Sequence, residues 1–555
     1  MDDPTIRFDT APDRYRHWRL DIAPPRATLT LAVDPGAGLR DDYELKTNSY
    51  DLGVDIELYD AVQRLRFEHP EVTVVVITGG VDKVFCSGAN IQMLAGATHR
   101  HKVNFCKFTN ETRNSIEDAT EHSGQVWLAA VNGTAAGGGY ELALACDEIL
   151  LVDDRASTVS LPEIPLLAVL PGTGGLTRVV DKRHVRRDLA DAFTTRGEGV
   201  RAETALAWGL VDATAPRSGF DALVDERVRA RAAGSHRPGH GPGVELTPIG
   251  GTWTGDGIAL RFVTVEIDRS IGAATITLRG PAGDQPSTGD ELVTAGADGW
   301  LLSAARQLDA VLLHLRFNET AVGTWVIRTE GDLDATTRAE AVLAAEPDHW
   351  LVREITRYWA RTLKRLDLSA RSVFTLIEPG STMAGPLAEL VLAADRSFML
   401  EGTWADRADP PPPARLRLTG GNLGAYPMAN GLSRLATRFW GRPAALAAAE
   451  QAVGKDLLAA DALEAGLVTF TPDDLDWDDE VRLAVEERNS FSPDALTGME
   501  ASYRFVGPET TETKIFARLS AWQNWIFQRP NAVGAYGALR RFGTGSRPDF
   551  DHRRV

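Results

Sequence analysis

Short apolar runs alternate with helix-like stretches along the first half of the chain. Residues 26–34 (RATLTLAVD), 71–78 (EVTVVVIT) and 125–131 (QVWLAAV) are rich in strand-forming residues and end at turn residues. Each run is followed by a stretch in which apolar positions recur with helical spacing, which is the alternation of βαβ units. The pattern therefore predicts an α/β fold for this half of the chain.

Two glycine-marked segments interrupt this alternation. In GGGYELALAC at 137–146, the glycines precede a helix-favouring run and place Glu141 in or near its first turn. In VFCSGANIQML at 84–94, a glycine loop precedes another helix start. Such loops can aim backbone N–H groups, here those of Gly138 and Ala89, at a ligand oxygen. The plainer alternative is a tight turn followed by an acid that favours a helix N-terminus.

A second glutamate, Glu163, lies between two prolines in VSLPEIPLLAVLPG at 159–172. An acid in a proline-bounded loop is often a solvated surface residue, but this loop has unusually apolar flanks. Desolvation there would raise the pKa of Glu163 towards the working range of a general acid or base. Two carboxylates with two glycine loops are the groups needed to move protons beside a polarised carbonyl. We interpret the first half as an enzyme that acts on acyl thioesters.

The second half repeats the first in a weaker form. Residues 234–257 are rich in Gly and Pro and predict a linker. Beyond it, ELALACDEI at 141–149 is echoed by ELVLAADRS at 389–397, and two further echoes follow in the same order, which indicates an internal duplication. The predicted parts are a catalytic domain at 1–233, the linker at 234–257, a degenerate scaffold domain at 258–482 and a helical segment at 483–555.

The two copies differ where the chemistry would take place. The second copy has no counterpart of CSGAN, a proline enters its glycine turn, and Thr419 stands where Glu163 would be. We therefore expect this copy to act only as a scaffold. The segment 514–530 (KIFARLSAWQNWIFQRP) carries a wide apolar stripe, which would promote association if it were exposed. We therefore expect the stripe to dock at a subunit interface or over the first copy's pocket, and we expect the protein to be a homodimer.

Composition narrows the class of protein. The chain has 555 residues, 43% of them hydrophobic and 25% charged, which is typical of a globular protein with several domains. A net charge of −18 argues against nucleic acid as the main partner. Three cysteines in no metal-ligand spacing, no secretory start and no long apolar run predict a cytoplasmic protein without metal or membrane partner.

The stretch from about 70 to 212 resembles the crotonase (enoyl-CoA hydratase/isomerase) superfamily through SGAN, AAVNGTAAGGGYELA, PEIPLLAVLPGTGGLTRV and WGLV. The resemblance implies a ββα spiral fold and coenzyme A as a part of the substrate, with no separate cofactor. It assigns Ala89 and Gly138 to an oxyanion hole, and Glu141 and Glu163 to the two carboxylate positions. The expected substrate-binding positions beside them are Ser87, Gly88, Gly137 and Gly139.

An ordinary member of this superfamily is about half as long. The doubled length with a degenerate second half is similar to ring-opening members that act on a non-aromatic benzoyl-CoA. That resemblance implies a lyase of aerobic benzoate catabolism, which cleaves 2,3-dihydro-2,3-dihydroxybenzoyl-CoA without oxygen to 3,4-didehydroadipyl-CoA semialdehyde and formate. A plain enoyl-CoA hydratase/isomerase and a non-enzymatic acyl-CoA-binding scaffold are the alternatives.

Cys106 lies in HRHKVNFCKFTNETRN, which in relatives forms helices over the acyl pocket. A free cysteine is most often a small buried apolar residue. The neighbouring histidines and lysines could instead lower the pKa of its thiol. Because loss of a one-carbon fragment needs an activated water, Cys106 is then a candidate base. The basic residues in question are His99, His101, Lys102 and Lys107.

Overall fold

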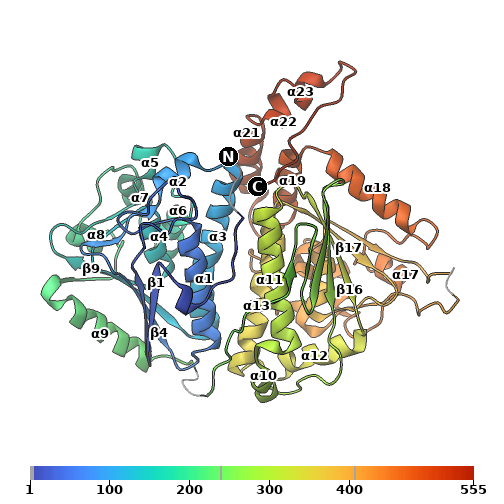
Figure 1. Ribbon diagram of the computed structural model, residues 1–555, viewed down its shortest axis with the longest axis horizontal. Helices are drawn as coiled ribbons and strands as arrows, with labels where there is room; N and C mark the ends of the chain where they lie inside the picture. Colours follow the sequence, from blue (N-terminus) through green and yellow to red (C-terminus); the bar gives the residue numbers. More distant parts are fainter. Residues whose placement is uncertain (1–4, 238–240, 406–407) are drawn as a thin grey trace. The chain divides into compact units, whose positions relative to one another are not determined.

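The computed structural model describes residues 5–237, 241–405 and 408–555. The chain divides into two compact units, Met1–Leu246 and Thr247–Val555 (Figure 1). The boundary falls inside the stretch 234–257, although Thr252–Trp253 of that stretch form strand β12. None of the helices in the described ranges combines the length and the apolar character that crossing a bilayer requires.

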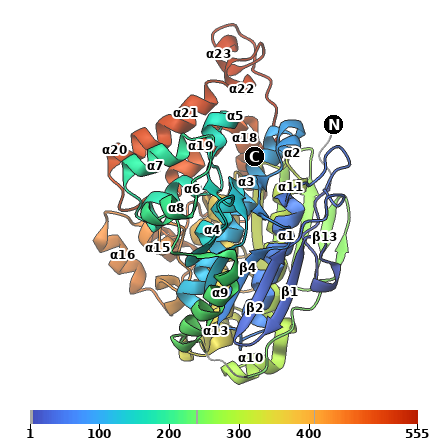
Figure 2. The same ribbon diagram turned by 90° about the vertical axis from the view of Figure 1, so that its left-hand side faces the viewer.

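Unit 1 is built on a six-stranded sheet in the order β1-β2-β4-β7-β9-β11 (Figure 2). Strands β1 and β2 are antiparallel, and the other neighbours are parallel. The predicted strands at 26–34, 71–78 and 125–131 correspond to β2, β4 and β7. The strands span Trp18–Ala23 (β1), Arg26–Leu31 (β2), Val74–Gly79 (β4), Val126–Val131 (β7), Glu148–Asp153 (β9) and Ala213–Pro216 (β11).

Both faces of the central strands are covered. Almost every residue of β4, β7 and β9 is buried, which is the pattern of a parallel sheet between two layers. Helix α9 packs on one face through Phe220, Val224 and Val228, which recur every fourth residue and so share one side of the helix. The helices are α1 (Leu52–Phe67), α2 (Ile91–Gly96), α3 (His99–Asp118), α4 (Gly138–Ala145), α5 (Glu163–Leu167), α6 (Gly175–Thr177), α7 (Arg187–Thr194), α8 (Ala202–Ala207) and α9 (Arg217–Ala233).

Short strands bring the two glycine loops of unit 1 together. Strands β5 (Val84–Cys86), β8 (Thr134–Ala136) and β10 (Val159–Ser160) form a parallel sheet in the order β10-β8-β5. Strand β3 (Ser49–Tyr50) pairs in parallel with β6 (Gly88–Ala89). Helix α4 begins one residue after β8, and the loop that contains β6 follows β5. Because β5 and β8 are neighbours in this sheet, the start of α4 and the β6 loop lie close together.

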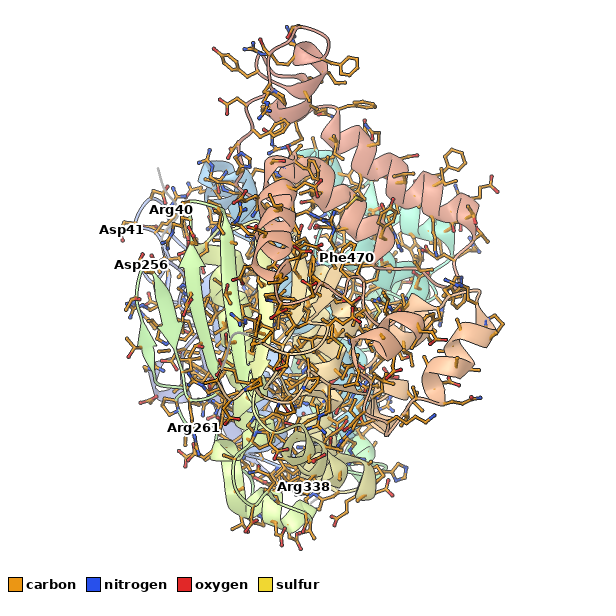
Figure 3. All side chains as sticks on the ribbon, turned by 90° about the vertical axis from the view of Figure 1, so that its right-hand side faces the viewer. Arg40, Asp41, Asp256, Arg261, Arg338 and Phe470 are labelled. Carbon is orange, nitrogen blue, oxygen red and sulfur yellow. The ribbon has the colours of Figure 1, made fainter. Side chains whose placement is uncertain are left out.

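Unit 2 repeats this topology. An antiparallel pair, β14 and β15, leads into parallel β16, β17 and β19, as β1 and β2 lead into β4, β7 and β9. Two further strands, β12 and β13, extend the edge beyond β14; Figure 3 labels Asp256 and Arg261 at the two ends of β13. The bounds are β12 (Thr252–Trp253), β13 (Gly257–Ala259), β14 (Val263–Asp268), β15 (Ala273–Arg279), β16 (Thr324–Glu330), β17 (Ser372–Ile377), β18 (Met383–Ala384), β19 (Arg396–Met399) and β20 (Leu416–Arg417).

The last part of unit 2 is helical and carries exposed aromatic residues. Within 514–530 no residue is buried, and Phe516 and Phe527 are 69% and 56% exposed. The helices of the unit are α10 (Gly289–Ala295), α11 (Trp300–Asn318), α12 (Leu333–Ala345), α13 (Trp350–Leu368), α14 (Ala388–Ala393), α15 (Arg434–Arg438), α16 (Pro443–Glu450), α17 (Ala459–Glu464), α18 (Trp477–Ser490), α19 (Pro493–Tyr503), α20 (Thr511–Thr513), α21 (Ser520–Ile526), α22 (Pro530–Val533) and α23 (Ala538–Arg541).

Candidate active site

The two expected oxyanion donors, Ala89 and Gly138, lie on loops that touch. Gly88 has φ +82°, and a Cβ added to it would lie 2.8 Å from the Gly138 nitrogen, so only glycine allows this approach. The Asn90 N–H donates to the Tyr50 carbonyl of β3 at 2.8 Å. Because successive N–H groups of a strand alternate in direction, the Ala89 N–H faces away from β3. Gly138 begins α4, where the first N–H groups have no partner within the helix.

The remaining expected binding positions surround these donors. Gly137 has φ +54°, and a Cβ there would lie 2.7 Å from Glu163 Oε1. A Cβ at Gly139 would lie 2.3 Å from the Cys86 carbonyl oxygen. Glycine is therefore required at 137 and 139, because a larger side chain would collide with Glu163 at one position and with Cys86 at the other. Ser87 donates its hydroxyl to Thr47 Oγ1 at 3.0 Å.

Glu141 lies in the first turn of α4 and is 2% exposed. Its Oε1 accepts hydrogen bonds from the backbone N–H groups of Thr173 (3.0 Å) and Gly175 (2.7 Å), and its Oε2 accepts one from the Thr173 hydroxyl. The loop after α5 thus fixes the carboxylate. Thr173 was not among the functional residues expected from the sequence, although the glycine-rich segment GTGG at 172–175 indicates a turn there.

The two prolines around Glu163 suggest a loop, but Glu163 is the first residue of the short helix α5. Proline fits the first turn of a helix, because the N–H it lacks has no partner there. Burial, with the charge of Glu141, raises the pKa of Glu163 to about 7, which confirms the expected direction. Its Oε2 is buried without a hydrogen-bond partner in the described part of the chain. Glu163 is therefore a carboxyl group that can exchange a proton near neutral pH.

Cys106 lies on α3 beside the same loop. Its Sγ would be 3.7 Å from a Cβ at Gly172, and Asn110 Nδ2 donates to the carbonyls of both Cys106 and Gly172 at 3.0 Å. Burial raises the pKa of the Cys106 thiol to about 11, with the charge of Glu141 adding to the effect. The alternative that neighbouring histidines and lysines lower this pKa is wrong: the cation that lowers it is Arg113, and burial outweighs that effect. At neutral pH Cys106 is a protonated thiol.

Other polar groups near the loops have structural partners. Asn90 caps α2 by accepting the Met93 N–H at 2.9 Å, and it donates to the Glu44 carbonyl and the Ser49 hydroxyl. The buried thiol of Cys86 donates to the Asn48 carbonyl. No group of three or more His, Cys, Asp or Glu side chains within the described residues is arranged to hold a metal ion.

Unit 2 contains an altered version of this arrangement. Gly385 has the same φ as Gly137, +54°, but Pro386 follows it and has no N–H to donate. The inference that this copy lacks a second carboxylate is wrong. Glu340 of α12 places its Cδ 2.6 Å from the position of a Cβ on Gly385, and Tyr426 donates its hydroxyl to Glu340 at 3.1 Å. Two of the groups that would bind a thioester, the CSGAN loop and the turn N–H, are nevertheless missing.

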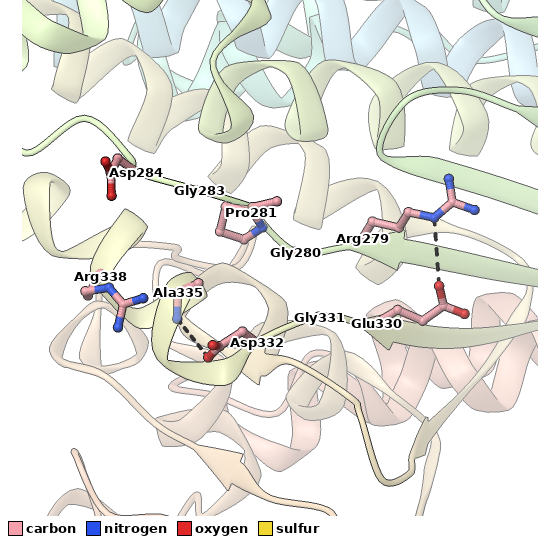
Figure 4. Close-up of a pocket in the computed structure, with 11 residues that line it drawn as sticks. Arg279, Gly280, Pro281, Gly283, Asp284, Glu330, Gly331, Asp332, Ala335 and Arg338 are labelled. Atoms are coloured by element: carbon pink, nitrogen blue, oxygen red, sulfur yellow. Dashed lines mark hydrogen bonds and ion pairs between the residues drawn. The ribbon is translucent and has the colours of Figure 1, made fainter. Parts of the chain in front are cut away.

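A cavity of about 610 Å³ lies at the carboxyl ends of β15 and β16 in unit 2 (Figure 4). Of its charged side chains, Arg279 lies 3.8 Å from Glu330, and Asp332 caps α12 by accepting the N–H groups of Asp334 and Ala335. The carboxylates that lie against the glycine loops expected from the sequence are those of unit 1, Glu141 and Glu163.

Comparison with known proteins identifies the family. Residues 44–234 match the model of the enoyl-CoA hydratase/isomerase family. The chain is 54% identical over 550 residues to benzoyl-CoA-dihydrodiol lyase of Aromatoleum evansii, covering 99% of this chain and 98% of that protein. It is 35% identical over 185 residues to the fatty acid oxidation complex subunit alpha of Shewanella loihica, covering 32% of this chain and 24% of the relative.

Among solved structures, an enoyl-CoA hydratase from Geobacillus kaustophilus aligns with 32% identity over 40% of this chain and 75% of its own, with a TM-score of 0.35. The family assignment rests on the full-length similarity in sequence. The chain belongs to the benzoyl-CoA-dihydrodiol lyases, double-length lyases of the crotonase superfamily.

Proposed function

We propose that this protein opens the ring of 2,3-dihydro-2,3-dihydroxybenzoyl-CoA and releases 3,4-didehydroadipyl-CoA semialdehyde and formate. The observation that carries this proposal is the full-length similarity to a benzoyl-CoA-dihydrodiol lyase. The nearness of Glu163 to Gly137 and of Glu141 to Gly175 in unit 1 supports it. The diol and one water give the semialdehyde, formate and one proton. Neither oxygen nor a redox cofactor enters this balance.

The oxyanion hole would act on the thioester carbonyl. When the one-carbon unit leaves, its bond to the carbon next to the thioester breaks, and the electron pair stays on that carbon. The negative charge then spreads onto the thioester oxygen as an enolate. Backbone donors such as the Ala89 and Gly138 N–H groups stabilise such charge, and loss of one donor typically costs about 10²–10³ in rate.

We assign the first proton transfer to Glu163. A ring hydroxyl must lose its proton before the ring C–C bond can break and leave an aldehyde. Glu163 has an unpartnered oxygen and a pKa of about 7, whereas Glu141 already accepts three hydrogen bonds. Glu141 would orient the water that attacks the one-carbon unit, with Cys106 beside it as a neutral thiol. In this proposal Glu141, and not Cys106 as considered from the sequence, acts on the water.

We further propose a homodimer with one active site per chain, in unit 1. Support comes from the exposed apolar side chains of 514–530, which include Phe516, Leu519 and Phe527. Exposed apolar side chains gathered on one segment are typical of an interface. Coenzyme A would enter only as part of the substrate.

Mass spectrometry of the products tests the function. The purified protein is incubated with the diol thioester, the acyl-CoA products are weighed, and formate is measured enzymatically. Ring opening predicts an acyl-CoA product that has lost one carbon, with formate in equal amount. A plain hydratase would instead consume crotonyl-CoA, seen as loss of the conjugated enoyl absorbance, and would leave the diol ring intact.

A further inference from the structure

Arg113 is a buried arginine directly behind the glycine loop of α4. It lies on α3 and is 1% exposed. One terminal nitrogen, Nη2, donates both to the Tyr50 hydroxyl (3.1 Å) and to the Gly138 carbonyl (3.2 Å). The other, Nη1, donates to the Thr109 carbonyl and lies 3.5 Å from Asp55 Oδ1. A single guanidinium therefore joins α3, β3 and the first residue of α4.

Tyr50 touches both expected oxyanion donors. Its backbone pairs with Ala89 in the β3–β6 ladder, and its carbonyl accepts the Asn90 N–H. Its hydroxyl oxygen lies 2.0 Å from the position that a Cβ on Gly138 would occupy, so the tyrosine rests against this glycine. The N–H of Ala89 and that of Gly138 thus belong to two elements, β6 and α4, that Tyr50 bridges.

The charge of Arg113 is costly to bury and is compensated locally. Asp55 is its counter-ion, and Asp55 in turn accepts the Thr109 hydroxyl. Burial of an ion pair is often no more stabilising than well-packed apolar side chains of the same size. The pair nevertheless supplies something that apolar packing cannot, namely directed hydrogen bonds to Tyr50 and to the Gly138 peptide.

We propose that Arg113 and Tyr50 are positioning residues that set the spacing and direction of the Ala89 and Gly138 N–H groups. Tyr50 fixes the β6 side, and Arg113 holds the Gly138 peptide by its carbonyl while anchoring the Tyr50 hydroxyl. This inference rests on the proposed role of these N–H groups in binding a thioester oxygen. Displacement of a reacting group by about 1 Å can cost about 100-fold in rate.

Tyr50→Phe removes only the hydroxyl, and Tyr140→Phe is its matched control. Tyr140 is also buried and lies on α4, but its hydroxyl donates to the Leu210 carbonyl at 2.6 Å and not to a residue of the glycine loops. The readouts are kcat, KM and the infrared carbonyl stretch of bound benzoyl-CoA labelled with ¹³C in its thioester. Binding to wild type should lower the frequency of that stretch, because the donors polarise the carbonyl.

We expect Tyr50→Phe to lose part of this shift and to lower kcat about 10-fold to 100-fold, with KM changed less than about threefold. Arg113→Lys, a second variant that keeps the charge, should behave similarly because lysine cannot place one donor between the Tyr50 hydroxyl and the Gly138 carbonyl. Tyr140→Phe should keep both the shift and kcat, whatever it does to the melting temperature.

The proposal is overturned if wild type shows no carbonyl shift, if folded Tyr50→Phe keeps the full shift and kcat, or if Tyr140→Phe loses as much of both. Binding of benzoyl-CoA needs no turnover. A wild-type shift that Tyr50→Phe diminishes, in a protein that does not cleave the diol, would therefore support the positioning role and refute the proposed reaction.

Discussion

Replacement of Glu163 by glutamine should make the protein nearly inactive and, above neutral pH, more stable. Glutamine has the shape of a protonated glutamic acid but cannot take a proton. Loss of a general acid or base typically costs about 10²–10⁴ in rate. Substrate binding should change much less, because the N–H groups that receive the thioester remain in place.

The gain in stability follows from the pKa of Glu163. Burial and Glu141 raise it from 4.5 to about 7, so the folded state holds a proton at pH values where the unfolded state has lost it. For a carboxyl group shifted upward, the free energy of unfolding falls as pH rises from about 4.5 to about 7 and is constant above that. The side chain is partly open to water, so we discount the full shift to about 1–2 kcal/mol.

The assay compares Glu163→Gln with wild type in denaturant unfolding at several pH values and in formate release. We expect the variant to gain about 1–2 kcal/mol at pH 8 and to lose this advantage as the pH falls to about 4.5. Wild-type kcat/KM should rise with pH through about 7, because the base must be deprotonated. Near-normal turnover in Glu163→Gln would exclude Glu163 as the base, and equal stability of the two proteins at pH 8 would exclude a raised pKa in the folded state.

Three other predictions concern the surrounding residues and the assembly. Because burial raises the pKa of the Cys106 thiol to about 11, Cys106→Ala should leave the pH profile of turnover unchanged; a formyl intermediate detected by mass in this variant would instead assign Cys106 to the water step. Gly137→Ala forces a positive φ on alanine and a Cβ against Glu163, so its rate of formate release should fall by about 10²-fold; activity close to that of wild type would contradict the packing. Light scattering should give a dimer that Phe516→Glu and Phe527→Glu dissociate, whereas a trimer or hexamer would contradict the proposed interface.

Local sequence patterns predicted the main features of the fold and many residues of the site. Runs of β-branched residues predicted the strands of unit 1, and the glycines predicted the start of α4. Both signals are local, because they depend on residues adjacent in the sequence. The rise in the pKa of Glu163 also followed from its apolar flanks, because desolvation by adjacent residues is visible in the sequence.

The misjudged features depend on contacts between distant segments. Thr173 holds Glu141 across a gap of 32 positions, and Glu340 reaches Gly385 from another helix. Sequence neighbours suggested a lowered pKa for Cys106, whereas its burial beside the loop at Gly172 determines the opposite direction. Side-chain packing of this kind leaves no periodicity or spacing by which a single sequence could reveal it.

The most direct test of the oxygen-independent ring cleavage uses ¹⁸O-labelled water under strictly anaerobic conditions. The protein is incubated with unlabelled 2,3-dihydro-2,3-dihydroxybenzoyl-CoA, and the formate is analysed by mass. Ring cleavage with water predicts formate that carries one ¹⁸O, because water supplies one of its oxygens and the diol supplies the other. Absence of formate without oxygen gas, or an acyl-CoA product that keeps all of the ring carbons, would contradict it.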